Sequence, residues 1–477
     1  MANGENMEQI FRLHMGKAPL ALDLSDGSER AEYVNQDYIL HLLGRPHRNI
    51  NLMYTWYPLD KDWPARMSEL YKGKEINSVW DYPYDDYFPF DGSAYECMKD
   101  VRRHGQDVTL TLTADCLIPD EMLREMAISF RPFGRMRLRI NHECMGNWFT
   151  HNKRYSFQEI ADFHVRFTRI IHEEAPNVKT IFCAGFAVED NAPVDCEEYF
   201  LEAYKTADVW SADRYIALHY GWPLDTAEKG KEDGSFNYQT IEKTYMDFFY
   251  THKRLCEQTG QDKPVVMSEL NADGDVVGAF HQGDVIRRFV DKIRDEKASW
   301  FEALTMYQFR DCGRLGLEVQ DPNNSSVGIA QPMLKEYKEL LKDPFVQPLM
   351  EQGESVSLPF TFRWGGAEDA DGLAIPLHFD KCPEFCELNF EDDLSLMLEL
   401  NGHWFYKAPQ TKFVDLMEAF YEDRIADGTD LTLRIFATPP DGVNVDDGRE
   451  DWTTDYYATM TKLPTLRLRY EPCGVVG

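Results

Sequence analysis

Eight short runs of apolar and β-branched residues recur between residues 18 and 344, and longer segments with helical periodicity separate them. The runs are residues 20–24, 50–54, 108–113, 136–141, 178–183, 209–213, 265–268 and 304–309. The helical patterns cover residues 29–43, 94–104, 121–130, 156–174, 196–205, 238–258 and 284–296. Alternation of this kind is typical of parallel sheets covered by helices. Eight repeats predict an α/β fold of the (β/α)8 TIM-barrel type.

The pattern changes after Pro344, where strand-like segments follow one another without long helices between them. These segments are residues 356–364, 394–400, 431–436 and 465–470. Such a series predicts an antiparallel β-sandwich. Since 477 residues also exceed what one hydrophobic core usually organises, we expect two domains, a barrel over 1–344 and a C-terminal β-sandwich over 345–477.

The chain carries 50 basic and 82 acidic residues, so its formal net charge is −32. A surface this acidic repels nucleic-acid phosphates, anionic lipid and highly acidic polysaccharides. Neutral glycans incur no such repulsion. The composition therefore argues against nucleic acid and membrane as partners, and it leaves the oligomeric state open.

Ten cysteines are scattered along the sequence, and only Cys382 and Cys386 form a close pair. No second pair accompanies them at the spacing of a zinc site, so we expect free thiols and no bound metal. The first residues lack the basic start and apolar stretch of a secretory signal. We expect a cytoplasmic protein, or a secreted one whose signal peptide has been removed.

The fourth run ends in a cluster of polar residues, from Asn141 through His142 to Glu143. The seventh run ends in a carboxylate as well, Glu269. Barrel enzymes place their chemistry at the C-terminal ends of the strands, and the fourth and seventh strands face each other across a closed eight-stranded barrel. Two facing carboxyl groups are what glycoside hydrolysis requires, with no cofactor. A glutamate at the end of a strand could also be an ion-pair partner of Arg137 or Arg139.

The segment from His142 to Phe149, which reads HECMGNWF, resembles the H-E-x-x-G-x-W-F signature of the β-mannanase and mixed-linkage β-glucanase family, within clan A of the retaining glycoside hydrolases. The resemblance implies that Glu143 is the general acid/base, that His142 orients it and that Trp148 lines the subsites. It also implies that Glu269 is the nucleophile and that Tyr215 hydrogen-bonds it. β-Mannan and β-glucan are the substrates that it suggests.

Further side chains on predicted loops at the barrel mouth are candidates for sugar binding, because aromatic rings stack on pyranose faces. They are Trp56, His219, Trp222, Tyr307 and Arg310, together with Asn141 at the end of the fourth strand. Aromatic residues also anchor long loops by packing, and an ion pair with Asp311 is the alternative for Arg310. The polar, glycine-containing segment 220–237 is expected to be a loop over the mouth.

The sequence thus favours a retaining β-glycoside hydrolase that acts on a β-linked neutral oligosaccharide or polysaccharide. Two alternatives stay open. One is a non-catalytic carbohydrate-binding protein built on a hydrolase-like barrel, and the other is a transglycosylase, which shares the covalent intermediate but uses a sugar as acceptor.

Overall fold

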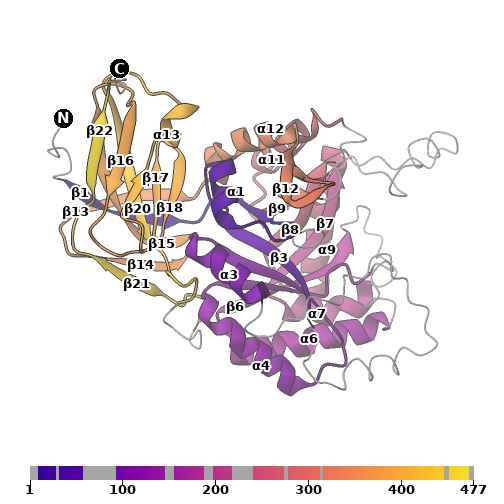
Figure 1. The fold of residues 1–477 in the computed structure, drawn as a ribbon. Coiled ribbons are helices and arrows are strands. Elements are labelled where there is room, and N and C mark those ends of the chain that lie inside the picture. The colour runs from indigo at the N-terminus through magenta and orange to yellow at the C-terminus, as the bar shows by residue number, and fades with distance from the viewer. Residues whose placement is uncertain are drawn as a thin grey trace.

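The computed structural model describes residues 9–27, 32–56, 93–145, 155–186, 197–216, 240–272, 278–311, 315–444 and 451–471. Figure 1 shows two parts side by side, a barrel surrounded by helices and a region of antiparallel sheets that holds the C-terminus. Among the described residues, no helix is long and apolar enough to cross a membrane.

Eight parallel strands close into the predicted barrel. They are β2 (Ala21–Ser25), β3 (Asn49–Trp56), β4 (Asp107–Ala114), β5 (Met136–Ile140), β6 (Val178–Phe186), β7 (Val209–Ile216), β8 (Val265–Ala272) and β9 (Phe301–Met306). All eight predicted strands are present. The last one lies three residues earlier than expected, and Phe309, beyond its end, still donates its backbone N–H to the carbonyl of Ser25, the last residue of β2.

Helices follow the strands and cover the barrel (Figure 1). They are α1 (Gln36–Leu43), α3 (Ser93–Arg103), α4 (Asp120–Phe130), α6 (Phe157–Glu174), α7 (Leu201–Thr206), α9 (Ile241–Thr259), α11 (Gln282–Asp295) and α12 (Met333–Leu341), with short 3-10 turns η2 (Arg131–Phe133), η3 (Glu197–Phe200) and η4 (Pro344–Val346). Ser156 and Glu159 form the capping box that starts α6, and Gly260 ends α9 in the left-handed conformation. The predicted first helix begins later than expected, because Asn35 caps it directly before Gln36.

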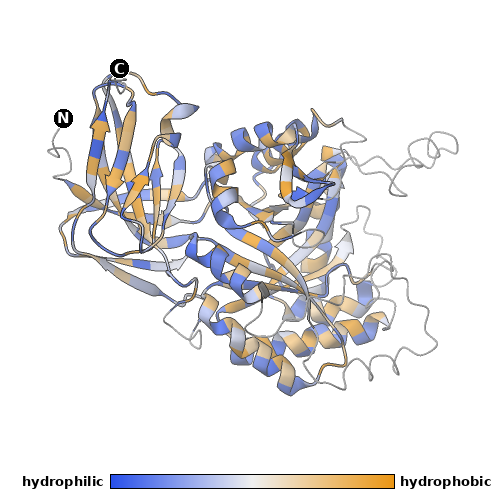
Figure 2. Ribbon diagram, viewed as in Figure 1, coloured by the Kyte–Doolittle hydropathy of each residue, from blue (hydrophilic) through white to orange (hydrophobic). Residues whose placement is uncertain are grey.

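The barrel strands alternate between two different environments. On β5, Met136, Leu138 and Ile140 belong to the large core beneath the helices, whereas Arg137 and Arg139 point to the barrel axis, where they meet carboxylates of other strands. The blue and orange alternation along the strands and helices is visible in Figure 2. Since a closed barrel buries both faces of each strand, polar residues on the inner face must find partners there.

At the N-terminal ends of the strands, the inner face carries a cluster of four charged side chains, which we call the lower charge cluster: Asp23, Arg48, Arg137 and Glu302. Arg48 Nη2 lies 2.6 Å from Asp23 Oδ2, and Arg48 Nη1 lies 2.9 Å from Glu302 Oε1. Arg137 Nη2 lies 2.5 Å from the same glutamate oxygen. Two arginines thus balance two buried carboxylates.

The C-terminal region consists of two antiparallel sheets packed face to face. The larger contains β13 (Leu349–Val356), β1 (Ile10–Gly16), β15 (Asp369–Phe379), β20 (Thr429–Ala437), β17 (Leu396–Leu400) and β18 (His403–Lys407), with β14 (Phe360–Gly366) and β21 (Tyr456–Met460) beside them. The smaller contains β19 (Phe413–Asp415), β16 (Phe385–Asn389) and β22 (Thr465–Arg469), and the short α13 (Glu418–Tyr421) lies nearby. The predicted strand 356–364 is divided between β13 and β14.

The N-terminal strand β1 departs from the predicted domain division. Residues 1–344 are expected to form the barrel domain, but β1 pairs antiparallel with β13 on one side and with β15 on the other. From β1 onward, the chain therefore leaves the C-terminal sheet, forms the barrel and returns to the same sheet. In Figure 1, the indigo strand β1 runs among the orange and yellow strands.

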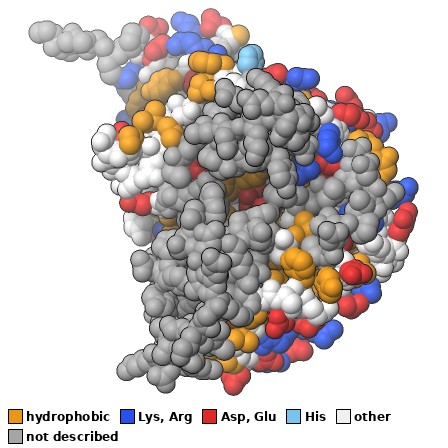
Figure 3. Space-filling model, turned by 90° about the vertical axis from the view of Figure 1, so that its right-hand side faces the viewer, with side chains coloured by type: hydrophobic (Ala, Val, Ile, Leu, Met, Phe, Trp, Pro, Cys, Tyr) orange, Lys and Arg blue, Asp and Glu red, His pale blue; other side chains and the backbone are white. Residues whose placement is uncertain are grey.

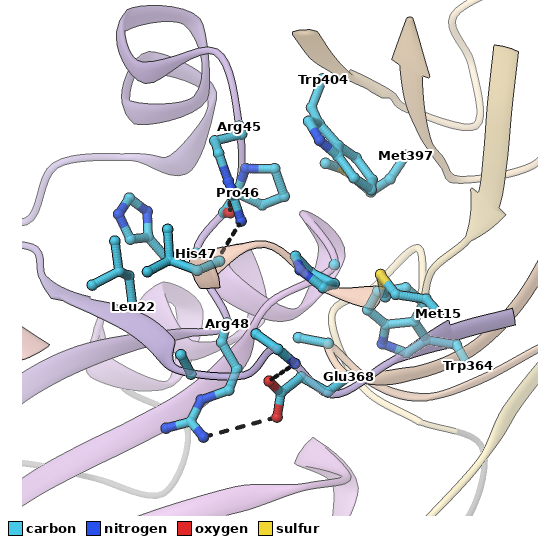
Figure 4. Close-up of a pocket in the computed structure, with 16 residues that line it drawn as sticks. Met15, Leu22, Arg45, Pro46, His47, Arg48, Trp364, Glu368, Met397 and Trp404 are labelled. Atoms are coloured by element: carbon cyan, nitrogen blue, oxygen red, sulfur yellow. Dashed lines mark hydrogen bonds and ion pairs between the residues drawn. The ribbon is translucent and has the colours of Figure 1, made fainter. Parts of the chain in front are cut away.

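Polar contacts and cation–π contacts join the two parts at the lower end of the barrel. Asp107 accepts a hydrogen bond from the backbone N–H of Ala367, and Arg135 pairs with Asp369. The ring of Trp452 lies under Arg137 and Lys179. Figure 4 shows a small pocket at this junction, with Glu368 directed at Arg48. The C-terminal region thus closes the end of the barrel that carries the lower charge cluster.

Near Asp321, a small three-stranded sheet is formed by β10 (Arg310–Asp311), β11 (Glu318–Asp321) and β12 (Asn324–Ala330). β10 directly follows the last barrel strand. This sheet therefore belongs to the C-terminal end of the barrel, opposite the junction.

Candidate active site

Three carboxyl groups converge at the C-terminal ends of the barrel strands. They belong to Glu143, three residues beyond β5, to Asp213 on β7 and to Glu269 on β8, and all three are buried. One oxygen from each lies within 4.8 Å of the others. With Arg139 we call them the upper carboxylate cluster. Figure 3 views the molecule from this side, where acidic side chains are visible deep in the centre of the face.

The turn that carries Glu143 is held on both sides by neighbouring strands. The Asn141 side chain accepts a hydrogen bond from the Ala114 N–H at 2.7 Å and donates one to the Ala114 carbonyl at 2.8 Å. The Met145 N–H donates to the Ala184 carbonyl of β6 at 2.7 Å. Asn141 and Glu143 both have positive φ, at 43° and 53°. Left-handed backbone is unfavourable for residues with a side chain, so these anchors maintain the turn.

Register shifts in the strand pairing surround the same region. The pairing of β6 with β7 shifts between Cys183 and Phe186, and the pairing of β7 with β8 shifts at Asp213. The pairing of β8 with β9 shifts between Met267 and Leu270. Irregularities of this kind re-aim side chains near the rims of barrels. Here they bring Asp213 and Glu269 opposite each other on adjacent strands.

Arg139 is the central cation of the upper carboxylate cluster. Its side chain is 1% exposed, its Nη2 pairs with Asp213 Oδ2, and its Nη1 donates to Glu269 Oε1 at 3.1 Å. The Cys183 thiol lies beside the pair, 3.5 Å from Asp213 Oδ2. One guanidinium therefore faces three carboxyl groups, an excess of acid over base.

Crowding of acids changes the protonation of Asp213. Burial raises its pKa, Arg139 opposes the rise and the nearby Glu269 charge adds to it, so that the pKa of Asp213 is about 8. Buried carboxyl groups close together resist ionising at the same time. The cluster thus retains a proton near neutral pH.

Tyr215 takes the position that the sequence resemblance implies. Its hydroxyl donates a hydrogen bond of 2.7 Å to Glu269 Oε2, so the two Glu269 oxygens contact Tyr215 and Arg139 separately. The Tyr215 ring packs edge-on against the buried Tyr307, with centroids 5.8 Å apart. Glu269 is therefore fixed at both oxygens, and Tyr307 supports the tyrosine that contacts it.

His142 is buried and directly precedes Glu143 in the sequence. Its Nε2 lies 3.9 Å from Glu269 Oε1. The resemblance implies that this histidine orients Glu143, and the structure also brings it near Glu269.

The structure describes some of the remaining predicted sugar-binding residues and not others. Arg310 is buried and pairs with Glu318 at 2.9 Å in place of the expected Asp311, because β11 brings Glu318 alongside β10. Asn141 uses its side-chain oxygen and nitrogen on Ala114, as described above. Trp148, His219, Trp222, the segment 220–237 and the side chain of Trp56 lie outside the described residues.

Asp213 and Cys183 are members of the site that the sequence analysis does not single out. Arg139 is expected there only as an alternative ion-pair partner of a glutamate, and it does pair with Glu269. A usable signal exists for Asp213, which lies two residues before Tyr215 on the same strand and therefore on the same face. Arg139 likewise precedes Asn141 by two residues.

A cluster of three carboxyl groups is also a possible ligand set for a divalent cation. The Arg139 guanidinium already lies against two of them and supplies the positive charge there. A metal ion in this cluster would face a fixed cation in direct contact with its ligands, so the arrangement disfavours metal binding at this site.

No protein-family model matches this sequence, and no curated protein sequence matches it. Solved structures with a similar chain trace include an endo-β-1,4-mannanase double mutant from Cellulomonas fimi, at 12% identity and a TM-score of 0.44, covering 92% of this chain and 93% of that one. A family 51 α-L-arabinofuranosidase from Bifidobacterium longum is 9% identical, with a TM-score of 0.46 and coverage of 89% and 96%. A monomeric β-xylosidase from Caulobacter crescentus is 11% identical, with a TM-score of 0.41 and coverage of 88% and 99%.

Proposed function

We propose that the protein is a retaining β-glycoside hydrolase, with Glu269 as nucleophile and Glu143 as general acid/base. The observation that carries the proposal is the spacing of these two carboxyl groups, which have oxygens within 4.8 Å of each other. Retaining glycosidases hold their two carboxyl groups about 5–5.5 Å apart, whereas inverting enzymes need about 6.5–9.5 Å to admit a water. The observed spacing supports direct attack by one carboxylate.

In the first step, Glu269 attacks the anomeric carbon while Glu143 donates its proton to the glycosidic oxygen. The bond to the leaving sugar breaks, and a covalent glycosyl ester forms on Glu269. Tyr215 and Arg139 contact the two oxygens of Glu269 and hold it in one orientation. Pre-positioning of this kind lowers the entropic cost of the attack.

In the second step, Glu143 accepts a proton from a water molecule, and the oxygen of that water attacks the anomeric carbon and releases Glu269. Glu143 must therefore carry a proton in one half of the cycle and lose it in the other. Three carboxyl groups against one guanidinium retain a proton in the site, as the raised pKa of Asp213 indicates. This charge imbalance supports the acid role of the cluster.

A β-linked neutral glycan is the substrate class we propose, with β-mannan and β-glucan as the first polymers to test. The motif from His142 to Phe149 supports a clan A enzyme, and the net charge of −32 disfavours polyanionic chains. A transglycosylase would use the same site with a sugar in place of water.

The test is a product screen of the wild-type protein against β-mannan, mixed-linkage glucan, laminarin, xylan and short oligosaccharides, followed by chemical rescue. We expect Glu269→Ala to lose at least about 10⁴-fold in turnover, as enzymes do when a nucleophile is removed. Added azide should fill the vacated space and yield a glycosyl azide of inverted configuration. Glu143→Ala keeps the nucleophile Glu269, so azide should not yield a glycosyl azide of inverted configuration with that variant.

Glu339→Ala is the control for expression and handling, since Glu339 is an exposed residue of α12. Full activity of Glu269→Ala would exclude it as nucleophile. Binding of oligosaccharides by the wild type without any product would favour a non-catalytic carbohydrate-binding protein. Products longer than the substrate in the presence of acceptor sugars would identify a transglycosylase.

A further inference from the structure

A second group of potential ligands lies at the opposite end of the barrel from the upper carboxylate cluster. His252 and Cys256 are one helical turn apart near the end of α9, and Asp262 lies in the segment between α9 and β8. His252 Nε2 is 3.2 Å from Asp262 Oδ1 and 3.6 Å from Cys256 Sγ, and Cys256 Sγ is 3.9 Å from Asp262 Oδ1. The three atoms thus form a compact triangle.

The dimensions of this triangle match one face of a tetrahedral zinc site. Zinc bonds of about 2.0–2.1 Å to nitrogen, 2.3 Å to sulfur and 2.0–2.2 Å to oxygen give tetrahedral edges of roughly 3.3–3.6 Å between ligand atoms. The observed separations of 3.2, 3.6 and 3.9 Å lie within a few tenths of an ångström of those edges. Imidazole, thiol and carboxylate are also the three side-chain types that zinc binds.

The three side chains do not form a catalytic relay. A cysteine, a histidine and an aspartate act as a relay when the thiol and the carboxylate contact opposite nitrogens of the ring. Here both contact the same nitrogen, Nε2 of His252. The three potential ligand atoms therefore lie around one common point, which is the arrangement that a bound cation requires.

The surroundings fix the ligands before any ion binds. The His252 ring stacks on Trp300 with centroids 4.8 Å apart and planes 9° apart, and it hydrogen-bonds to the backbone of Lys263. Outer contacts of this kind are typical of metal-binding histidines, because they set the ring orientation. The Lys263 ammonium in turn contacts three backbone carbonyls, of Tyr204, Lys205 and Ala207, which holds the segment that carries Asp262.

We propose that His252, Cys256 and Asp262 bind a zinc ion, with the fourth position open to water. The Asp262 side chain is 82% exposed, so solvent reaches the centre of the triangle directly. Binding would release the thiol proton of Cys256 to solvent. The ion would join the end of α9 to the segment that leads into β8, the strand on which Glu269 lies. Its expected role is structural, since no described catalytic group lies in this triangle.

The test uses the full chain after treatment with a chelator, and Co²⁺ serves as a spectroscopic probe for zinc. We expect one equivalent of Co²⁺ to produce a thiolate-to-cobalt charge-transfer absorption, which Zn²⁺ then abolishes by displacement. Cys256→Ser should lose that absorption entirely. Asp262→Asn and His252→Gln should weaken binding by more than the ten- to hundredfold that loss of an outer-shell partner costs.

Cys97→Ser is the matched control, because Cys97 is another half-buried cysteine with a free thiol. It should bind Co²⁺ as the wild type does. Asp262→Asn changes an exposed side chain, so it keeps the test informative should Cys256→Ser fold poorly. Absence of the charge-transfer absorption in the wild type, or its persistence at full strength in Cys256→Ser, would overturn the proposal.

Discussion

The two ends of the barrel interior bury charged groups in opposite balance. In the lower charge cluster, Arg48 and Arg137 balance Asp23 and Glu302. One further charge of each sign lies beside them, with Lys17 3.6 Å from Glu302 and Glu368 3.8 Å from Arg48. In the upper carboxylate cluster, one arginine faces three carboxyl groups. The same side-chain types thus form a neutral network at one end and an acidic one at the other.

The electrostatic consequences differ accordingly. Burial alone would raise the pKa of Glu302, but Arg137, Arg48 and Lys17 together hold it far below its usual range. Asp213 has its pKa raised to about 8 at the other end. Perturbed carboxyl groups that keep a proton near neutrality are typical of catalytic sites, whereas fully paired ones contribute to stability. Burial of charge therefore does not by itself mark a functional site, and the excess of carboxyl groups over guanidinium is what distinguishes the upper carboxylate cluster.

The largest effect is expected when one buried glutamate at each end of the barrel is replaced by glutamine. Glu302→Gln should destabilise the protein by about 3–5 kcal/mol at pH 7, because it leaves the buried Arg137 without its carboxylate partner and removes one of the carboxylates that face Arg48. Glu269→Gln should leave the free energy of unfolding unchanged or raise it, because it relieves repulsion among three carboxyl groups, while activity is lost. Urea denaturation and turnover of both variants measure the contrast. Equal losses of stability would contradict it.

The loss in Glu302→Gln should also depend on pH with a definite sign. Since the folded-state pKa of Glu302 is lowered, its contribution is complete above the unfolded value near 4.5 and declines as the pH falls below it. The difference between wild type and Glu302→Gln should therefore be larger at pH 7 than at pH 3.

A smaller effect of opposite sign is expected for Asp213. Its folded-state pKa is raised, so the wild type loses stability as the pH increases from about 4, the unfolded value, through about 8. Asp213→Asn imitates the protonated form and should remove this decline, a relative gain of a few kcal/mol at pH 8.5. Denaturation across pH 4.5–8.5 measures it.

Asp208, at the other end of the same strand, is the control for that series. Its pKa is lowered, because hydrogen bonds with His172 and Thr180 outweigh burial. Asp208→Asn should therefore lose stability across the neutral range and leave the decline toward pH 8.5 in place. If the stability of Asp213→Asn still declines toward pH 8.5, the decline is due to the titration of another group.

The smallest effect is expected for Tyr215→Phe, which removes one hydrogen bond to Glu269 and little packing. A hydrogen bond to a charged group is worth about 1.5–3 kcal/mol, so kcat should fall roughly 10- to 100-fold while the Tm stays close to that of the wild type. Tyr33→Phe, which removes a similar 2.7 Å bond to Asp100, should leave kcat unchanged. An unchanged kcat in Tyr215→Phe would show that this bond does not orient the carboxylate.

Local patterns in the sequence predict the barrel well because each strand and helix carries its own periodicity. Glu143, Glu269 and Tyr215 are predicted to lie together from a motif and from strand order, and the structure places Tyr215 in contact with Glu269. Their catalytic roles stay predictions, as do sugar-binding roles for Trp148, His219 and Trp222.

Local sequence patterns do not predict two features of the structure. The alternation of arginine and apolar residues on β5 does not reveal which face turns inward, because a closed barrel buries both. The sequence therefore offers Arg139 only as an alternative ion-pair partner of a glutamate, and it does not predict the contact with Asp213. The sequence does not predict the strand β1, because its partners, β13 and β15, follow more than 300 residues later. Pairing over such a separation leaves no short-range signal.

The position of β1 has a consequence for biosynthesis. It leaves the ribosome long before its partners, because β13 begins roughly 330 residues further along the chain. At about 5–20 residues per second, β1 waits roughly 15–70 s with both edges unpaired. Unpaired edges are where strands of other chains add. Of the described strands, β1 is thus the first to be made and among the last to be paired, and chains released before β13 is complete would expose residues 10–16 as an unpaired strand.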